Sequence, residues 1–391
     1  MNPCISLETD LASITTEAVM VLSNPVGPQR LRKVMAQCVM AVGLATLLVL
    51  IAFTVQKRLQ AQGIASGFGF LWERAGFDLS ESVISFNGND SYFRALLAGF
   101  SNTLKVAVCS IVAAVTIGLV AAAAQLSEHA LARRTAKLYV AVVRNTPLLL
   151  QLFFWFGVFT ISMPGPKAAI QLLPGVFASN RGIDFPWPSP SGWLVVLALV
   201  IGLGASLAFW LKNRGGPGWA PAAMLLAVLG FAAWSALNGL FELDIPVAGG
   251  FSIRGGGKIS PEFLALFIGL SVYTGSYIAE AIRGAVLAIP SGQIDAGNAL
   301  GLRTSMVLLL IIIPQAIRIA LPAVVSELLN LVKNSSLGVA VGYPELVSAG
   351  NTAMNQTGQA IELITIYMVV YVTFNLIVTK LFAVWERRYA W

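Results

Sequence analysis

The sequence predicts an all-α integral membrane protein. Of its 391 residues, 57% are hydrophobic and only 11% are charged, whereas ordinary soluble domains carry roughly 25% charged residues. Several apolar runs are long enough to cross a hydrocarbon core of roughly 30 Å as helices that rise about 1.5 Å per residue. We therefore expect most apolar side chains to face lipid or other membrane helices.

About eight membrane-spanning helices are expected, and they set the domain boundaries. A tail, 1–35, is too long and too acidic for a signal peptide, so the first span, 36–55, is expected to stay as an anchor. A loop, 56–92, follows it, and a short tail, 385–391, ends the chain. The other spans are expected near 97–124, 139–162, 193–211, 220–240, 261–284, 317–341 (broken) and 361–384.

Basic residues predict how the spans are oriented. With the N-terminus inside, Lys and Arg are denser in the cytoplasmic segments than in the outer loops, as the positive-inside rule requires. A basic cluster at 30–33 precedes the first span, and Arg387 and Arg388 follow the last one. Lys57 and Arg58 oppose the trend. The balance predicts that both termini lie in the cytoplasm.

Residues 164–258 form an insertion that carries the spans 193–211 and 220–240. Its flanks are rich in Pro and Gly, which disfavours a helix throughout either of them. Neither inserted span contains a charged residue, and lipid-facing helices need none. We expect these two helices to pack at the periphery.

Catalytic, nucleotide-binding and metal-binding functions are not supported by the residues. The stretch GGFSIRGGGKIS lacks the phosphate-loop pattern, because Ser252 replaces its first Gly and Ile259 follows Lys258. The single histidine, His129, lies in a short polar loop. The widely spaced cysteines suggest neither a zinc site nor a disulfide framework: they are Cys4, Cys38 and Cys109. No enzyme activity and no bound cofactor are expected, and the net charge of +7 belongs to the span ends rather than to a nucleic-acid surface.

The stretch GQIDAGNALGLRTSMVLLLIIIPQAIRIALP, Gly292 to Pro322, combines a small-residue segment with an interrupted apolar run. Small residues permit close approach of another backbone, and prolines disfavour helix continuation. The pattern predicts two short cytoplasmic helices broken by prolines, with a rigid docking knob in the first half. The predicted docking residues are Ile294, Asp295, Ala296, Gly297, Ala299, Leu300, Gly301, Leu302 and Pro314.

This stretch resembles the EAA loop of the membrane subunits of type I ABC importers. The family spacing is E-A-A, three residues, G, nine residues, I-x-L-P. The matching positions here are Asp295, Ala296, Gly297, Gly301, Ile311, Ile313 and Pro314. The departures keep the spacing, although Gly in place of the second Ala weakens a helix by about 1 kcal/mol.

Three further blocks strengthen the resemblance. YVAVVRNTPLLLQLFF is similar to the R-x-T-P-L-L-x-Q signature of the polar-amino-acid subfamily, and YTGSYIAEAIRGAVLAIPSGQ and LVKNSSL resemble two other blocks. The loop segment WERAGFDLSESVISF is similar to that of Q-type permeases of general L-amino-acid importers. The family-signature residues are Arg144, Thr146, Pro147, Glu280 and Arg283.

The resemblance implies a MetI-like permease domain at 93–384, with a coupling loop at 286–314. It implies an inner-membrane subunit that imports L-amino acids such as glutamate, glutamine, aspartate, asparagine or histidine. Its partners would be two ATPase subunits that use ATP and Mg, a second permease of the M type, and a periplasmic binding protein. The insertion is hypothesised to be a docking platform for that binding protein.

Polar groups within spans are candidates for the substrate path, and four are chosen: Gln151, Glu327, Asn330 and Lys333. Structural roles compete for the signature residues. Glu280 and Arg283 lie three apart on one helix face and could pair with each other. Arg144 could serve orientation, and the Thr146–Pro147 pair could only shape a kink.

Two other function classes remain open from the residues alone. A self-sufficient secondary transporter or channel would show internal repeats or titratable pairs within its spans, and no convincing repeat is found. A membrane-embedded enzyme or assembly factor would need a cluster of His, Cys or Asp residues, which is not seen. Co-purification with an ATPase and a second permease would distinguish the importer subunit from both.

Overall fold

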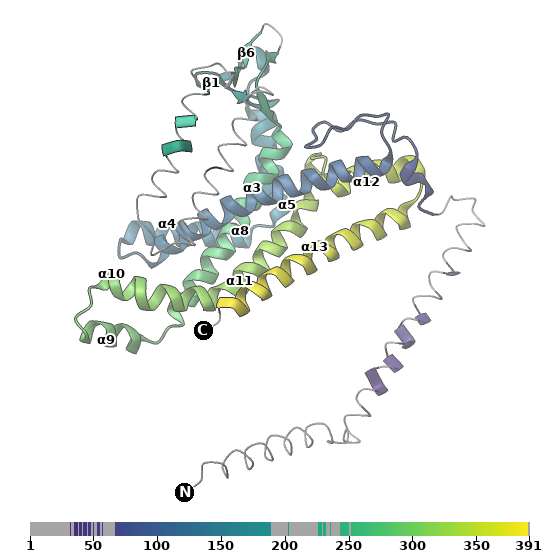
Figure 1. Ribbon diagram of the computed structural model, residues 1–391. Helices are drawn as coiled ribbons and strands as arrows, with labels where there is room; N and C mark the ends of the chain where they lie inside the picture. Colours follow the sequence, from purple (N-terminus) through teal and green to yellow (C-terminus); the bar gives the residue numbers. More distant parts are fainter. Residues whose placement is uncertain are drawn as a thin grey trace. The chain divides into compact units, whose positions relative to one another are not determined.

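The computed structural model describes residues 67–188, 243–249 and 252–389 without a break, together with isolated positions between 32 and 57 and between 202 and 235. The chain divides into two units, Met1–Phe68 and Gly69–Trp391, and every element named below belongs to the second (Figure 1). Its helices are α3 (Tyr92–Leu126), α4 (Ala130–Asn145), α5 (Leu148–Gly157), α8 (Pro261–Leu287), α9 (Ser291–Ala299), α10 (Thr304–Val307), α11 (Ile313–Asn334), α12 (Leu346–Thr357) and α13 (Ala360–Tyr389). Shorter helical turns are η1 (Gly69–Trp72), η2 (Val158–Ser162), η3 (Pro166–Ala168), η4 (Leu308–Ile312) and η5 (Ser335–Val341).

Helix α8 forms the centre of the bundle. In its most apolar window 67% of the residues are buried, against 6% in α13. It runs parallel to α3, since Lys105 in the first half of α3 lies over the ring of Phe263 at the start of α8, and Gly118 meets Ile278 further along both helices. The α3–α8 pair therefore carries the packing of the other helices.

Small residues allow α3 and α8 to approach closely. A Cβ atom at Gly118 would lie 2.5 Å from Cγ2 of Ile278. A Cβ atom at Gly275 would lie 2.9 Å from Cγ2 of Ile117 and 3.2 Å from the carbonyl oxygen of Ala114. Membrane helices associate through this kind of close packing, because lipid supplies no hydrophobic force between them.

The predicted span 139–162 is not one straight helix. Helices α4 and α5 meet at 104°, and the break falls between Asn145 and Leu148, at the Thr146–Pro147 pair. Proline cannot donate the helical hydrogen bond and restricts the residue before it, which ends α4. The segment predicted as the span 139–162 is therefore bent, and the alternative that the Thr146–Pro147 pair shapes a kink is confirmed.

The segment after α9 is also different from the prediction. Helix α10, turn η4 and helix α11 join into one helical span with η5, Thr304–Val341, so Pro314 and Pro322 do not separate two short helices. In the wide turn η4, the N–H of Ile313 donates to the carbonyl of Leu308, five residues back. This widening removes the clash that a proline ring makes with the carbonyl four residues before it. Membrane helices tolerate such prolines more readily than soluble ones.

Helix α12 was not predicted. Its N-cap is Glu345, a fully buried residue whose carboxylate accepts hydrogen bonds from the N–H groups of Val347 (2.9 Å) and Ser348 (2.8 Å). Burial raises the pKa of Glu345 to about 8. Helix α12 packs on the first part of α3, where Leu346 N–H also donates to the hydroxyl of Thr103.

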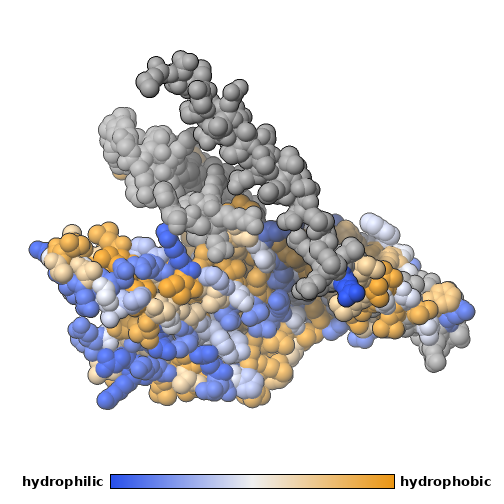
Figure 2. Space-filling model, turned by 90° about the horizontal axis from the view of Figure 1, so that it is seen from below, coloured by the Kyte–Doolittle hydropathy of each residue, from blue (hydrophilic) through white to orange (hydrophobic). Residues whose placement is uncertain are grey.

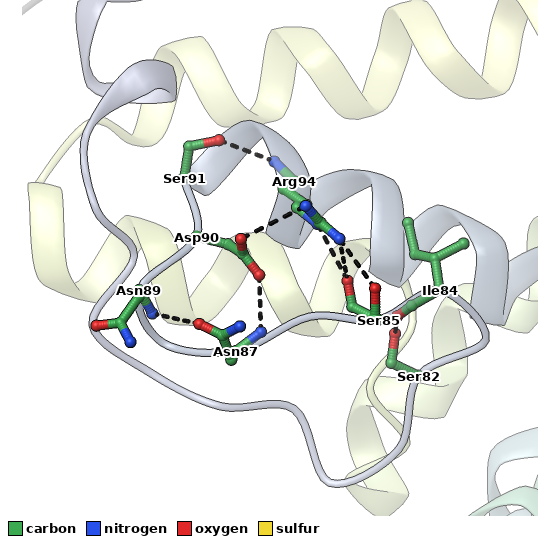
Figure 3. Close-up of polar contacts among 8 residues, drawn as sticks. All are labelled: Ser82, Ile84, Ser85, Asn87, Asn89, Asp90, Ser91 and Arg94. Atoms are coloured by element: carbon green, nitrogen blue, oxygen red, sulfur yellow. Dashed lines mark hydrogen bonds and ion pairs between the residues drawn. The ribbon is translucent and has the colours of Figure 1, made fainter.

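The segment before α3 folds back along that helix. Figure 3 shows Arg94 of α3 holding it: Nε and Nη2 donate to the carbonyl of Ser85 at 3.0 and 2.8 Å, and Nη1 lies 3.5 Å from Asp90. The side-chain oxygen of Asn102 accepts from Val83 N–H at 3.1 Å. Residues 69–91 are thus an ordered cover over the start of α3.

Short strands form at both flanks of the insertion. Strands β1 (Ile170–Leu173), β2 (Val176–Ser179), β3 (Gly182–Phe185) and β8 (Gly257–Ile259) make an antiparallel sheet in the order β1-β2-β3-β8. Two smaller pairs are β4 (Trp187–Pro188) with β5 (Leu243–Asp244) and β6 (Val247–Ala248) with β7 (Ile253–Arg254). Because β3 pairs with β8 and β4 with β5, the two flanks meet at one place. The prediction that the flanks are not helical throughout is confirmed.

Within the described residues, four helices are long and apolar enough to cross a membrane, and the bent α4–α5 pair would make a fifth. Three of them match the predicted spans 97–124, 261–284 and 361–384. The fourth covers the predicted span 317–341, which was expected to be broken but belongs to one helical span, Thr304–Val341. The predicted spans 193–211 and 220–240, and most of 36–55, lie outside the described residues. Figure 2 shows hydrophobic side chains over much of the described surface, including exposed Val112, Ile319 and Val369, as expected for helices in contact with lipid or a partner.

The α3–α8 contact can be tested with a matched pair of glycines. We expect Gly118→Ala to destabilise the protein by about 1–3 kcal/mol, because the new methyl group overlaps Ile278. Gly284→Ala, at a helical glycine of α8 with nothing within 4 Å, should be neutral or stabilising, since Ala favours helices. Melting temperatures in detergent measure both, and equal values for the two variants would contradict this packing.

Candidate functional site

Helix α9 is a short, well-terminated helix. It begins after Pro290 and ends in a Schellman motif, in which Gly301 N–H donates to Asn298 (2.9 Å) and Leu302 N–H donates to Gly297 (3.2 Å). Gly301 has φ of +73°, a left-handed conformation that strains residues with a side chain. The glycine at this family position therefore ends the helix sharply.

Gly297 attaches α9 to the next helix. It is the only buried residue of α9. A Cβ atom there would lie 2.8 Å from Val307 and 3.2 Å from Ile311. Leu302 packs on the same apolar cluster, which contains Ile289, Val307, Ile312 and Ala316. The departure from Ala at this position thus has a packing reason that outweighs its helix propensity, and Pro314 lies in the first turn of the helix that continues from this cluster.

The rest of α9 is free surface. Asp295, Ala296 and Ala299 are exposed, and the large apolar side chains of Leu300 and Ile294 are 79% and 41% exposed. A rigid helix with small residues and uncovered apolar side chains is suited to fit a groove in another protein. The structure brings the predicted docking residues together and divides them into a mounting side and a free side.

A second feature is a charged cavity of about 610 Å³ near the end of α8 that leads into α9. Three helices contribute to it, and its lining residues are Gln125 of α3; Lys137, Val140, Ala141, Arg144 and Asn145 of α4; and Tyr277, Glu280 and Arg283 of α8. Helix α4 is fixed against α8 by the hydroxyl of Tyr139, which donates to the carbonyl of Val272 at 2.7 Å. The cavity walls therefore depend on the packing of α3, α4 and α8.

The α4–α5 bend places Arg144 in this cavity. Thr146 Oγ donates to the carbonyl of Val142 (2.9 Å). Gln151 of α5 reaches back, and its Nε2 donates to the carbonyls of Val143 and Thr146, both at 3.0 Å. These contacts satisfy the carbonyls of Val142 and Thr146 at the end of α4 and give the carbonyl of Val143 a second donor besides the N–H of Thr146. Gln151, predicted for the substrate path, has a structural contact instead of lining the cavity.

The charges in the cavity are only partly compensated. Glu280 forms a bidentate pair with Arg283, with Nε 3.1 Å from Oε2 and Nη2 2.5 Å from Oε1, so the predicted pairing of these two residues is confirmed. The guanidinium of Arg144 lies 4.8 Å from the centre of the Tyr277 ring, a cation–π contact. Lys137 has no ion pair among the described residues. The cavity therefore retains positive charge.

One buried donor in the cavity is left without a partner. Gln125 is 5% exposed, and its Nε2 has no hydrogen-bond partner in the described part of the chain. Buried polar groups are nearly always paired, with protein, water or ligand. An unpaired amide beside two cations is an arrangement that would accept an anionic group such as a carboxylate.

The other predicted path residues lie elsewhere, on α11. Glu327 is half-buried, and Asn330 and Lys333 are exposed; none of them lines the charged cavity. With Ser326, the last two form an exposed stripe at helical spacing. Their role in the path stays a prediction. Sequence reasoning did not single out Gln125, Lys137 or Tyr277, although Gln125 is a polar residue at the end of an otherwise apolar run.

Comparison with known proteins places these features in a family. Residues 114–391 match the family described as binding-protein-dependent transport system inner membrane component. The chain is 41% identical to the general L-amino acid transport system permease protein AapQ of Rhizobium johnstonii, over 86% of each chain. It is 32% identical to the glutamate/glutamine/aspartate/asparagine transport system permease protein BztB of Rhodobacter capsulatus, over 96% of this chain and 98% of that one. It is 21% identical to the glutamate/aspartate import permease protein GltJ of Escherichia coli strain K12, over 77% of this chain and 89% of that one.

The structural role of Gln151 can be separated from a role in transport. We expect Gln151→Leu to lower stability by about 1–3 kcal/mol, because the carbonyl of Thr146 loses its side-chain donor and that of Val143 loses one of two donors. The melting temperature in detergent measures this loss. An unchanged melting temperature together with weakened substrate affinity would instead support the path assignment.

Proposed function

Because the chain belongs to the family of binding-protein-dependent transport system inner membrane components, we propose that it is one of two permease chains in an ATP-driven importer of polar L-amino acids. The observation that carries the proposal is its 41% identity to AapQ over 86% of both chains. Separate ATPase subunits supply the energy, and a periplasmic binding protein delivers the amino acid. ATP-dependent uptake of labelled L-glutamine by the reconstituted complex, with and without the binding protein, tests this assignment.

In this proposal α9 docks into a groove of one ATPase subunit on the cytoplasmic side of the membrane. Both termini of the chain lie on that side too. Two properties support the assignment: the free side of α9 is exposed, and Gly297 fixes the other side to Val307. A rigid contact between α9 and the helix after it would transmit a displacement of α9 to α11, whereas a flexible contact would not.

The charged cavity belongs to the substrate path. A charged side chain that faces lipid near the membrane centre costs roughly 2.5–3.5 kcal/mol. For this reason, charged side chains of membrane helices usually face a cavity or another protein. Arg144, Lys137 and the free amide of Gln125 suit the carboxylate of an amino acid. Glu280 offers the opposite charge to its ammonium group.

The stripe on α11 faces the second permease chain. Lys333 and Asn330 are exposed, and lipid would be an unfavourable environment for both. A related permease packed along α11 would cover them and close the path on its open side. The identity of this partner, a different M-type chain, follows from the resemblance to Q-type permeases.

Coupling through α9 can be tested by enlarging its free side. We expect Ala296→Arg to reduce ATP-driven uptake by about tenfold or more while the protein still inserts, because the long charged side chain no longer fits a groove shaped for Ala. Gly301→Trp should also uncouple, since the left-handed backbone there does not accept a side chain. Ala296→Ser is the matched control and should behave like the wild type. Normal uptake and normal stimulation of ATP hydrolysis in both variants would contradict the coupling role.

The role of the charged cavity in transport can be tested with two arginines of α4. We expect Arg144→Ala to lower uptake by about tenfold, the effect of losing one hydrogen bond to a charged group, while the binding protein still stimulates ATP hydrolysis. Arg134→Ala, an exposed residue of the same helix that does not line the cavity, should leave uptake unchanged. Equal uptake in the two variants would remove Arg144 from the path.

A further inference from the structure

A second charged cavity, of about 370 Å³, lies at the opposite end of α8. Its lining comes from four separate segments of the chain: Ser80 and Glu81 before α3; Thr160 of η2; Asn180 and Arg181 between β2 and β3; and Lys258, Ser260, Pro261 and Glu262 at the junction of β8 and α8. The insertion therefore supplies one wall of this cavity.

The wall formed by the insertion is rigid. Asn180 N–H donates to the carbonyl of Pro164 at 2.8 Å, which ties the β2–β3 turn to the end of η2. Gly182 has φ of +114°, and any Cβ atom there would overlap the carbonyl of Ile259. Only glycine allows this close approach of the turn to β8. The turn thus holds Arg181 beside the start of α8.

The opposite wall is equally fixed. Glu81 forms an ion pair with Lys105 of α3 at 3.1 Å, and Asn102 donates to its backbone carbonyl at 2.9 Å. Arg94 ties down the following residues of the segment (Figure 3). The cavity is therefore a preformed feature of the fold.

Charges of both signs line this cavity. Arg181 and Lys258 are exposed cations, and Glu262 is a half-buried anion in the first turn of α8. The side chains of Arg181 and Glu262 have no hydrogen bond or ion pair with any other residue that the structure describes. The positive end of the α8 dipole stabilises the carboxylate of Glu262, which lies in the first turn of that helix. A small zwitterion matches this pattern, with its carboxylate at the cations and its ammonium group at Glu262.

The two cavities share one face of α8. Glu262 and Glu280 each line one cavity; eighteen residues make about five helical turns, so both point to the same side, about 27 Å apart. This separation approaches the thickness of a hydrocarbon core. Between them, Leu152 of α5 packs directly on Gly269 of α8, so the two cavities are closed off from each other along this face.

We propose that the cavity lined by Arg181, Lys258 and Glu262 is an outer receiving site for a zwitterionic amino acid, which lies there before it reaches the charged cavity at Arg144. This inference rests on the proposed function as an amino-acid permease. It also gives the insertion a direct part in holding substrate, in addition to any contact with the binding protein.

The test uses a local readout at the cavity. In the full complex, with Cys4, Cys38 and Cys109 replaced by Ser, Asn180→Cys provides an exposed thiol for a membrane-impermeant maleimide. We expect L-glutamine to slow labelling from the outer side by about threefold or more. L-Glutaminamide lacks the carboxylate and N-acetyl-L-glutamine lacks the ammonium group, so neither should protect. Adding Arg181→Ala should abolish protection. Arg254→Cys, on exposed β7 outside the cavity, is the control that L-glutamine should not protect.

Uptake by the same preparations separates this inference from the proposed function. If the complex takes up substrate with ATP but L-glutamine does not slow maleimide labelling of Asn180→Cys, the receiving site is overturned and the permease assignment stays intact. The same holds if L-glutamine and its two analogues slow labelling equally. Failure of the wild-type complex to take up amino acids would instead overturn the permease assignment. Labelling of Asn180→Cys only from the inner side would overturn both the site and the proposed orientation.

Discussion

The close approach of α3 and α8 is the constraint on which the other features depend. Gly118 and Gly275 leave no room for side chains between these helices. Helix α4 packs on the same pair, through Val140 against Ala121, Ala122 and Ala279. The charged cavity takes residues from all three helices at this end of the pair. A wider α3–α8 separation would therefore move the cavity walls apart and weaken the packing of α4 against this pair.

Helix α9 is packed directly against the long helix that follows it. Gly297 holds α9 against Val307, and the helical span that starts at Thr304 continues to Val341 over 38 residues. At about 1.5 Å per residue this span is about 57 Å long. Because η4 accommodates Pro314 without a break, the helix that holds α9 extends to η5, which leads into the buried Glu345 cap of α12.

Helix α8 relates the two charged cavities to each other. Each cavity has an acidic residue from α8 and cations from a neighbouring segment, and tight packing of Leu152 on Gly269 separates them. A transporter must hold its substrate on one side while the other side is closed. In the function proposed here, two polar cavities on one helix face, with a packed contact between them, would meet that requirement.

Spacing along the chain was enough to predict features that depend on neighbouring residues. It placed a short helix at α9, paired Glu280 with Arg283 three residues away, and offered the kink at Pro147. Such features arise within one or two helical turns, where sequence separation fixes geometry. The other features depend on packing. The contact with Val307 explains why position 297 has no side chain, and the wide turn η4 explains how the helix accommodates Pro314. The carbonyls of the preceding helix explain the position of Gln151. The charged cavity joins Gln125 to Glu280, which no local pattern connects, because only the α3–α8 contact brings them together.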